Sequence, residues 1–175
     1  MLRREKCVCC ANDEAEVLYV KNGFEICRCR ECGHIFVADP LAIDTAKLYT
    51  GEFFDNVYGN YDQRADVYRK TFKNYLKIIQ HYVQTGNLLE LGCGFGHFLD
   101  VCRGSFRAIG MDLADQALMQ ARAHGHNAIQ GDYLDRSFSE PFNVIVMWDF
   151  IEHIPKPDEI LMKACGNWFR VGISF

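Results

Sequence analysis

A glycine-rich turn is the most chemically informative feature of this 175-residue sequence. Residues 88–91 read Leu-Leu-Glu-Leu, and Gly-Cys-Gly-Phe-Gly follows directly over residues 92–96. A helix-forming segment comes next, so the pattern predicts a strand, a tight turn and a helix. Glycine lets a ligand approach the main chain closely, and the first N–H groups of a helix are free to bind one. The sequence therefore predicts a ligand site at this turn.

The spacing of these glycines argues against a dinucleotide. A dinucleotide-binding turn has the pattern G-x-G-x-x-G. Here Gly92, Gly94 and Gly96 alternate, and His97 holds the position of the third glycine. This difference favours S-adenosylmethionine (SAM) over NAD. Taken alone, the turn could also be an ordinary link between a strand and a helix.

Acidic residues end the next two apolar runs. Asp112 follows residues 107–111, about 20 residues beyond Glu90, where an acid can accept both hydroxyls of a ribose; it could instead cap a following helix. Asp132 follows residues 127–131. It could accept an adenine amino group while Tyr133 lies against the ring, although a simple turn is an equal alternative.

A fourth apolar run completes a series of motifs. It reads F-N-V-I-V-M-W-D-F-I-E-H-I-P-K-P at 142–157, after E-L-G-C-G-F-G at 90–96, G-M-D-L-A at 110–114 and Q-G-D at 130–132. In this order and spacing the motifs resemble those of class I SAM-dependent methyltransferases. The alternation of strands and helices also argues for a parallel sheet covered on both faces. The expected fold class is α/β, with a Rossmann-like doubly wound sheet.

The resemblance implies roles for the residues at these motifs. Glu90 and the three glycines would surround the methionine part of SAM, and Trp148 with Asp149 would face the sulfonium and the substrate. The expected cofactor-binding residues are Glu90, Gly92, Gly94, Gly96, Asp112, Leu113, Asp132, Tyr133 and Trp148.

The reaction would be an in-line methyl transfer, in which much of the protein's work is alignment. If the acceptor is a hydroxyl or an amine, a base takes its proton. His153 is the candidate because imidazole ordinarily titrates near neutral pH, and Asp149 is the second candidate catalytic residue. His153 could instead pack beside Pro155 as a histidine that flanks a helix.

Cysteine usage is the second informative feature. Six of the nine cysteines lie in the first 32 residues. The pairs Cys7/Cys10 and Cys29/Cys32 give C-x2-C-x18-C-x2-C, which falls within the spacing of zinc sites. Four thiolates would hold a structural Zn²⁺ ion tetrahedrally. Disulfides or unliganded thiols are the alternatives. The remaining two, Cys9 and Cys27, could substitute as ligands or be buried thiols.

This N-terminal segment resembles the zinc-ribbon lobe that precedes some bacterial small-molecule and sugar methyltransferases. The resemblance rests on C-V-C-C at residues 7–10 and R-C-R-E-C-G-H-I-F-V at 28–37. Residues 1–6 have no apolar core like that of a secretory signal, so a cytoplasmic location is expected, where disulfides are disfavoured.

Three segments are expected. Residues 1–38 form the ribbon, with strands near 17–20 and 34–37. Residues 39–86 hold an aromatic cap segment and an amphipathic helix over 64–83, and residues 87–175 form the SAM-binding domain. The cap aromatics could close over a sulfonium or form a hydrophobic seam; they are Tyr49, Phe53, Phe54, Tyr58 and Tyr61.

A truncated or naturally shortened family member is expected from the last part of the sequence. After residue 157 it holds one predicted helix, 158–168, and one predicted strand, 171–175, where the family has further strands. The apolar edge at 171–175 could pair with a second copy of the chain to form a homodimer.

Charge and hydropathy bound the partners. There are 19 basic and 23 acidic residues, a net charge of −4, so overall attraction to nucleic acid is not expected. Arg28 and Arg30 could form a local basic patch, but a solvated face is preferred. No apolar run is long enough to span a membrane.

The leading hypothesis is methyl transfer to a small molecule, by resemblance a sugar or nucleotide sugar. The alternatives are a zinc-ribbon RNA methyltransferase and a SAM-binding protein without catalysis.

Overall fold

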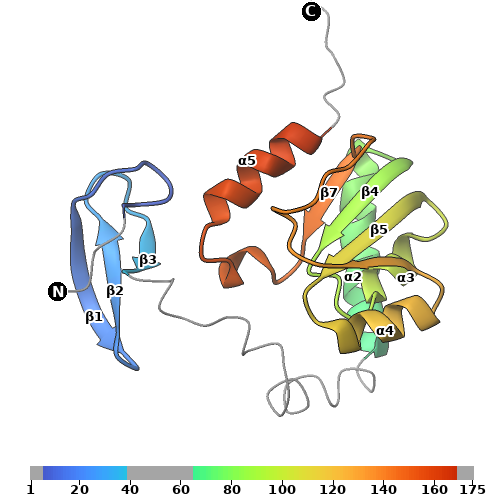
Figure 1. Ribbon diagram of the computed structural model, residues 1–175, viewed down its shortest axis with the longest axis horizontal. Helices are drawn as coiled ribbons and strands as arrows, with labels where there is room; N and C mark the ends of the chain where they lie inside the picture. The colour runs from blue at the N-terminus through green and yellow to red at the C-terminus, as the bar shows by residue number, and fades with distance from the viewer. Residues whose placement is uncertain (1–5, 39–64, 169–175) are drawn as a thin grey trace, which may run out of the picture.

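The N-terminal part of the computed structural model is a small antiparallel sheet; the structure describes residues 6–38 and 65–168 (Figure 1). The sheet has the order β1-β2-β3, with β1 at Ala15–Lys21, β2 at Phe24–Cys29 and β3 at Ile35–Val37. Asn22 and Gly23, which join β1 to β2, have φ angles of 52° and 85°. Both angles are positive, as the tight turn of a two-residue hairpin requires.

The strand β2 is absent from the sequence expectations, which place strands only near 17–20 and 34–37. It pairs with β1 from Ala15↔Cys29 to Lys21↔Phe24 and with β3 from Ile26↔Val37 to Arg28↔Ile35, so it forms the centre of the sheet. An Asn-Gly pair between two apolar segments is a strong local signal for a hairpin, and it could have identified this strand.

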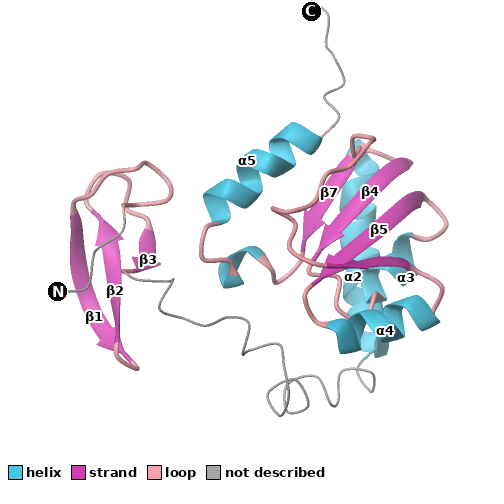
Figure 2. Ribbon diagram, in the orientation of Figure 1, coloured by secondary structure: helices cyan, strands magenta, loops and turns pink. Residues whose placement is uncertain are grey.

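The second sheet is parallel and has four described strands in the order β6-β5-β4-β7 (Figure 2). The strands are β4 at Gly86–Leu91, β5 at Phe106–Asp112, β6 at Asn127–Gln130 and β7 at Val144–Met147. The chain adds strands first on one side of β4 and then on the other. Such a reversal creates a crevice at the carboxyl ends of the strands, where α/β proteins bind ligands.

Helices cover both faces of this sheet, as the sequence predicts. They are α2 at Ala65–Tyr82, α3 at His97–Cys102, α4 at Asp115–Ala123, the short 3₁₀ helix η4 at Ile151–His153, and α5 at Pro157–Asn167. The helix predicted over 64–83 is confirmed as α2, and the one predicted over 158–168 as α5, which has Pro157 in its first turn, where the missing N–H is not needed.

Alternation along β4 separates two layers of the core, because successive side chains of a strand point to opposite faces. Leu88 packs with Phe98 of α3 and with Phe72 of α2. Leu89 packs on the other face with Ile160 of α5. Both leucines are fully buried, and burial of such a side chain stabilises the fold by about 1.5–3 kcal/mol. The expected doubly wound α/β architecture is therefore confirmed.

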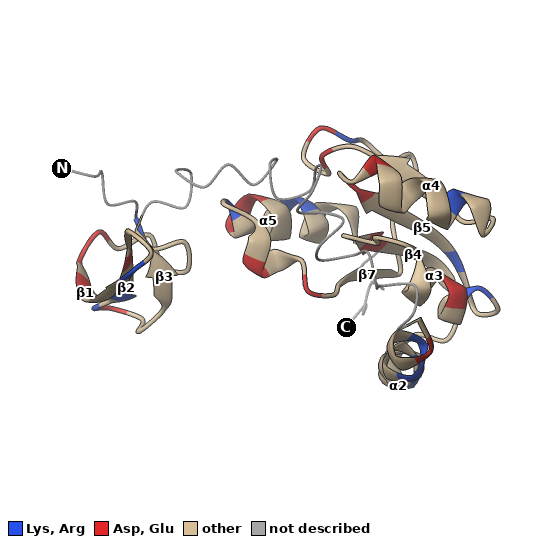
Figure 3. Cartoon of the chain, turned by 90° about the horizontal axis from the view of Figure 1, so that it is seen from below, with Lys and Arg blue, Asp and Glu red and all other residues tan. Residues whose placement is uncertain are grey.

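Charged residues of both signs are interspersed over the described elements (Figure 3). Arg28 and Arg30 lie 3.7 and 4.0 Å from the carboxylate of Glu16 on β1. Their charges are thus partly balanced within the sheet, in agreement with a solvated face.

Two sequence expectations fall outside the described residues. They are the aromatic cap within residues 39–64 and the last strand at 171–175, together with the dimer edge that it would form. Among the helices that the structure describes, none has the length and apolar character to cross a bilayer. The three-segment division remains a prediction.

Candidate functional site

The turn between β4 and α3 is built on left-handed glycines. Gly92, Gly94 and Gly96 have φ angles of 76°, 49° and 81°, which side-chain-bearing residues adopt only with strain. A Cβ atom at Gly92 would lie 2.6 Å from the ring of Phe150, whereas one at Gly94 would meet no atom within 4 Å. The turn is therefore packed tightly at Gly92 and open at Gly94.

Asp112 ties this turn to the end of β5. Its Oδ2 accepts the backbone N–H of Gly94 at 2.8 Å, and its Oδ1 accepts that of Ala114 at 2.9 Å. A carboxylate has about four acceptor positions, so both oxygens can also accept from a ligand. Capping and ligand binding are thus compatible at Asp112 and need not be alternatives.

Two adjoining cavities lie at the carboxyl ends of the strands. The inner cavity, of 230 Å³, lies between the glycine turn, α2 and the end of β7, and the outer cavity, of 300 Å³, lies between β5, the residues after β6, and η4. Both are lined by Gly92, Asp112, Asp149 and His153. A single elongated ligand could therefore extend through both.

The cavities bring together nearly all the residues that the sequence singles out. Glu90, Gly94 and Trp148 line the inner cavity. Leu113, Asp132 and Tyr133 line the outer one. Gly96 lines neither; it precedes α3 and lies against the side chains of His126 and Ala121.

Glu90 is an acid inside the core. It is 2% exposed, and no hydrogen-bond partner of its Oε2 lies among the described residues. Burial, and secondly the charge of Asp112, raise the pKa of Glu90 well above its ordinary value. A buried carboxyl oxygen without a partner beside a cavity indicates a place for a ligand that carries a donor or a positive charge.

Trp148 forms a wall of the inner cavity against α2. Its ring stacks on Tyr75, with centroids 4.6 Å apart, and meets Phe98 edge-on at 5.4 Å. Its indole Nε1 is buried, and no partner for it lies among the described residues. The ring closes the apolar side of the cavity, and its N–H is available as a donor.

Asp132 and Tyr133 occupy different environments in the outer cavity. Asp132 is exposed, and its Oδ1 accepts the backbone N–H of Leu134 at 2.8 Å. Tyr133 is 3% exposed and packs in the core, where its hydroxyl accepts a hydrogen bond from Asn167 at 2.8 Å. Burial raises the pKa of the Tyr133 hydroxyl. The ring borders the cavity from the core side, and its stacking on adenine stays a prediction.

Asp149 and His153 lie where the cavities adjoin. Both side chains are exposed. The backbone of Asp149 has a φ angle of 48°, a left-handed conformation that is uncommon for a non-glycine residue and often found at functional sites. The η4 turn holds His153 through its N–H to Phe150 O, at 3.0 Å. Both are positioned beside the junction of the cavities.

An ion-pair network behind the glycine turn is missing from the sequence expectations. Asp100 of α3 accepts from His126 at 2.8 Å and from Arg69 of α2 at 3.1 Å. Its partners are 26 and 31 residues away in sequence, so no local pattern points to them. Since the His126 ring also lies against Gly96, the network connects α2, α3 and the turn.

Asp100 should stabilise the fold in a pH-dependent way. Burial alone would raise the pKa of Asp100, but the hydrogen bonds from His126 and Arg69 outweigh it and hold the pKa below its ordinary value. Such a group contributes stability above its unfolded pKa of about 3.9, and this contribution is lost as the pH falls through the folded value. Asp100→Asn should therefore lower the melting temperature at neutral pH, and the difference from wild type should shrink in acid.

Asp66→Asn is the matched control, because Asp66 also lies near Arg69, at 3.7 Å, but its side chain is fully exposed. Thermal unfolding followed by circular dichroism at several pH values compares the two. Equal, pH-independent changes in both variants would contradict a special role of Asp100.

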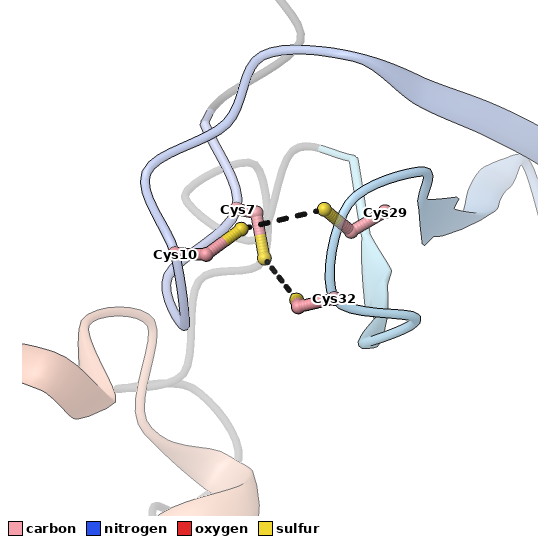
Figure 4. Close-up of side chains that lie close together, drawn as sticks. All are labelled: Cys7, Cys10, Cys29 and Cys32. Atoms are coloured by element: carbon pink, nitrogen blue, oxygen red, sulfur yellow. Dashed lines mark hydrogen bonds between the residues drawn. The ribbon is translucent and has the colours of Figure 1, made fainter.

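The four cysteines of the two C-x2-C pairs converge at one end of the N-terminal sheet (Figure 4). Their sulfur atoms all lie within 4.8 Å of one another, with Cys7–Cys32 at 3.6 Å and Cys10–Cys29 at 3.5 Å. A hydrogen bond from the backbone of Cys32 lowers the pKa of the Cys29 thiol to about 7. The cluster can hold a metal ion, and tetrahedral thiolate ligation is typical of structural Zn²⁺.

Cys9 and Cys27 lie outside this cluster. Cys9 is exposed, and Cys27 is fully buried in β2. Of the roles that the sequence leaves open for these two, the buried-thiol interpretation fits Cys27.

Comparisons with known proteins agree with this geometry. A family model described as a methyltransferase domain matches residues 61–166. Two similar curated proteins are ubiquinone biosynthesis O-methyltransferases. The one from Xylella fastidiosa is 30% identical over 94 residues, which cover 49% of this chain and 38% of that protein. The one from Neisseria meningitidis is 33% identical over 91 residues, which cover 46% of this chain and 38% of that protein. The matches thus span 38% of the length of these relatives.

Solved structures share the fold. The plantazolicin methyltransferase BpumL, in complex with S-adenosylhomocysteine (SAH), superposes with a TM-score of 0.57 and 20% identity over 74% of this chain and 55% of that chain. SAM-bound CalS10, an amino pentose methyltransferase from Micromonospora echinaspora, superposes with a TM-score of 0.51 and 15% identity, over 69% of this chain and 53% of that chain. At these identities the likeness concerns the Rossmann-type architecture alone.

Proposed function

Because this chain belongs to the methyltransferase domain family, we propose that it binds SAM across the two cavities and transfers the methyl group to a small-molecule acceptor. The observation that carries the proposal is the pair of adjoining cavities at the carboxyl ends of the strands. They share Gly92 and Asp112, and the inner one is lined by Glu90, whose Oε2 has no partner within residues 6–38 and 65–168. Solved neighbours bind SAM or SAH, which supports the choice of cofactor.

The described residues fit the parts of SAM. Glu90 would accept from the methionine ammonium in the inner cavity, where the open side of Gly94 leaves room for the ligand. Asp112 would accept from the ribose hydroxyls beside Leu113, and the exposed Asp132 would accept from the adenine amino group. When bound, the cofactor supplies an electrophilic methyl group on a positively charged sulfur.

The protein's contribution to transfer would be alignment and proton removal. The aromatic side chains of Phe72 and Trp148 form an apolar wall that excludes water from one side of the inner cavity, and Tyr75 stacks on Trp148 behind it. His153, beside the junction of the cavities, would take the proton of a hydroxyl or amine acceptor. Asp149 would line the acceptor side.

We also propose that Cys7, Cys10, Cys29 and Cys32 hold a structural Zn²⁺ ion. The four sulfurs converge as a tetrahedral site requires, and two of the residues are buried. Four protein ligands would leave no open position for a substrate, so the ion would stabilise the N-terminal sheet.

A small-molecule acceptor is favoured over RNA. The net charge is −4, and the basic pair Arg28 and Arg30 lies beside Glu16, whereas affinity for nucleic acid rests on unneutralised basic groups. The printed name of one neighbour, an amino pentose methyltransferase, supports a sugar or nucleotide sugar as the first acceptor class to test. A SAM-binding role without transfer is the remaining alternative.

Methyl transfer can be tested directly. The full, zinc-loaded chain is incubated with methyl-labelled SAM and a panel of sugars, nucleotide sugars, phenols and RNA. Formation of SAH together with a labelled small molecule is expected. SAM binding with no transfer to any acceptor would favour the role without catalysis, and transfer to RNA alone would contradict the small-molecule proposal.

Gly94→Ala should weaken SAM binding with little loss of stability. The new methyl group would meet no protein atom within 4 Å, so folding loses only the left-handed strain, about 1–2 kcal/mol. In the complex the methyl group would occupy ligand space, and we expect SAM affinity to fall about tenfold or more, the equivalent of at least 1.4 kcal/mol. Calorimetry and thermal unfolding measure the two effects.

Two further alanine variants serve as controls. Gly92→Ala should chiefly destabilise the fold, because its Cβ would lie 2.6 Å from Phe150. Gly104→Ala, which has no close neighbour and no positive φ, should change neither quantity. If Gly94→Ala binds SAM as wild type does, the cofactor does not approach the main chain at this glycine.

A further inference from the structure

Glu90 lies in an unusual position for an acid. It is the one charged residue of β4, it is 2% exposed, and its Oε2 has no hydrogen-bond partner among the described residues. It also lines the inner cavity. An ionised carboxylate in such a place is costly unless a positive charge or donors compensate it.

The lining of the inner cavity supplies no permanent positive charge. None of its described residues is Lys or Arg. The titratable groups around Glu90 are Asp112 from β5, Asp149 and His153 from the segment after β7, Cys93 and His97 from the glycine turn and α3, and Tyr68 from α2.

The neighbours of Glu90 do not stabilise its ionised carboxylate. Asp112 adds a like charge, and together with burial it raises the pKa of Glu90. Behind the cavity, burial raises the pKa of the Cys102 thiol on α3 to about 12, so this neighbour is neutral. The burial of Glu90, the absence of Lys and Arg from the cavity lining and the charge of Asp112 thus all favour its protonated form when no cationic ligand is bound.

We propose that Glu90 senses the charge of the cofactor, releasing a proton to solvent when SAM binds and releasing less when SAH binds. This inference rests on the proposed function. SAM carries a sulfonium, an ammonium and a carboxylate, and thus one net positive charge. SAH lacks the sulfonium charge and is neutral overall. The carboxylic acid of Glu90 becomes a carboxylate beside the positively charged SAM molecule, and its proton passes to the buffer.

Because proton release accompanies SAM binding, it sets the direction in which SAM affinity changes with pH. Below the pH at which the ligand's own amino group loses its proton, SAM affinity rises with pH up to the pKa of Glu90 in the free protein, by at most about tenfold per pH unit for one proton. SAH affinity rises less. After methyl transfer the sulfonium charge is gone, and Glu90 takes a proton back from solvent. SAH is therefore held less tightly than SAM.

Calorimetric titration in two buffers with different heats of ionisation tests the proposal. The full, zinc-loaded chain is titrated with SAM and with SAH at about pH 6, where the ligand's amino group, with a pKa of about 7.7–8.0, is already protonated. For SAM the measured heat should differ between the buffers, in proportion to the protons released. For SAH the difference should be smaller.

Variants assign the proton to Glu90. Glu90→Gln keeps the size of the side chain and the neutral state, and it should bind SAM with the same heat in both buffers. His153→Asn removes the exposed imidazole that lines both cavities, and it should retain the buffer dependence.

Buffer-independent heats for the wild type, or equal proton release for SAM and SAH, would overturn the proposal, and so would persistent release in Glu90→Gln. If Glu90→Gln does not fold, the difference in proton release between SAM and SAH on the wild type still tests the proposal. Absence of binding of either ligand to a folded chain would instead overturn the proposed function.

Discussion

Replacement of Cys10 by serine is expected to remove the metal ion and unfold the N-terminal sheet, whereas replacement of the adjacent Cys9 leaves both intact. Within residues 6–38 the buried apolar residues are Cys7, Cys27, Cys29 and Ala38. Two of these four belong to the metal cluster, so the sheet has almost no apolar core of its own. Small domains of this kind depend on a metal or on disulfides.

The expected effect is large because metal binding and folding are coupled. Structural Zn²⁺ contributes about 10–16 kcal/mol of binding free energy in small zinc domains. Cys9 is a matched control, because it is also exposed and lies next to Cys10 but outside the cluster.

Metal analysis and hydrogen exchange measure the outcome. Wild type and Cys9→Ser should contain one zinc ion per chain and protect the amides of β1 and β2. Cys10→Ser should contain less metal and lose this protection, as should wild type treated with a chelator. A Cys10→Ser protein that keeps one zinc ion and an ordered sheet would contradict the assignment.

Replacement of Asp112 by alanine is expected to lower SAM affinity about 100-fold. The change removes the proposed acceptor of the ribose hydroxyls, and hydrogen bonds to charged groups are worth about 1.5–3 kcal/mol each. It also frees the N–H groups of Gly94 and Ala114 that the carboxylate binds. The glycine turn would then lose its connection to β5 as well as its contact with the ligand.

Two variants separate these effects. Asp112→Asn keeps one acceptor oxygen and the shape of the side chain, so its loss of affinity should be intermediate. Asp115→Ala removes an exposed acid three residues away whose partner is Arg122, at 3.4 Å, and should bind SAM as wild type does. Titration calorimetry compares all three. Wild-type affinity in Asp112→Ala would exclude Asp112 from the cofactor site.

The sequence predicts the parallel sheet and the glycine turn because both rest on local signals. An apolar run that leads into the glycine turn marks β4, a run that ends in Asp112 marks β5, and helical spacing marks α2. The central strand β2 is missed, since its Asn22-Gly23 signal is not considered. Tyr133 is expected at the ligand, and only the tertiary structure shows its ring within the core.

Contacts between distant segments explain what local patterns cannot give. Asp100 meets Arg69 and His126 only after α2 and α3 have packed together. The sequence likewise identifies Glu90 as a site residue but does not show that its Oε2 lacks a partner among the described residues, because the cavity beside it is formed by Phe72 of α2, His97 of α3 and Trp148. Long-range packing therefore decides the electrostatics of a site whose position local sequence already indicates.

Titration of the folded, zinc-loaded wild-type chain with SAM, followed by calorimetry, tests the central claim most directly. We expect one molecule bound per chain with a dissociation constant in the micromolar range, and weaker binding of SAH that becomes relatively weaker as the pH rises. A folded protein that takes up neither SAM nor SAH would contradict the assignment of the two cavities as a cofactor site.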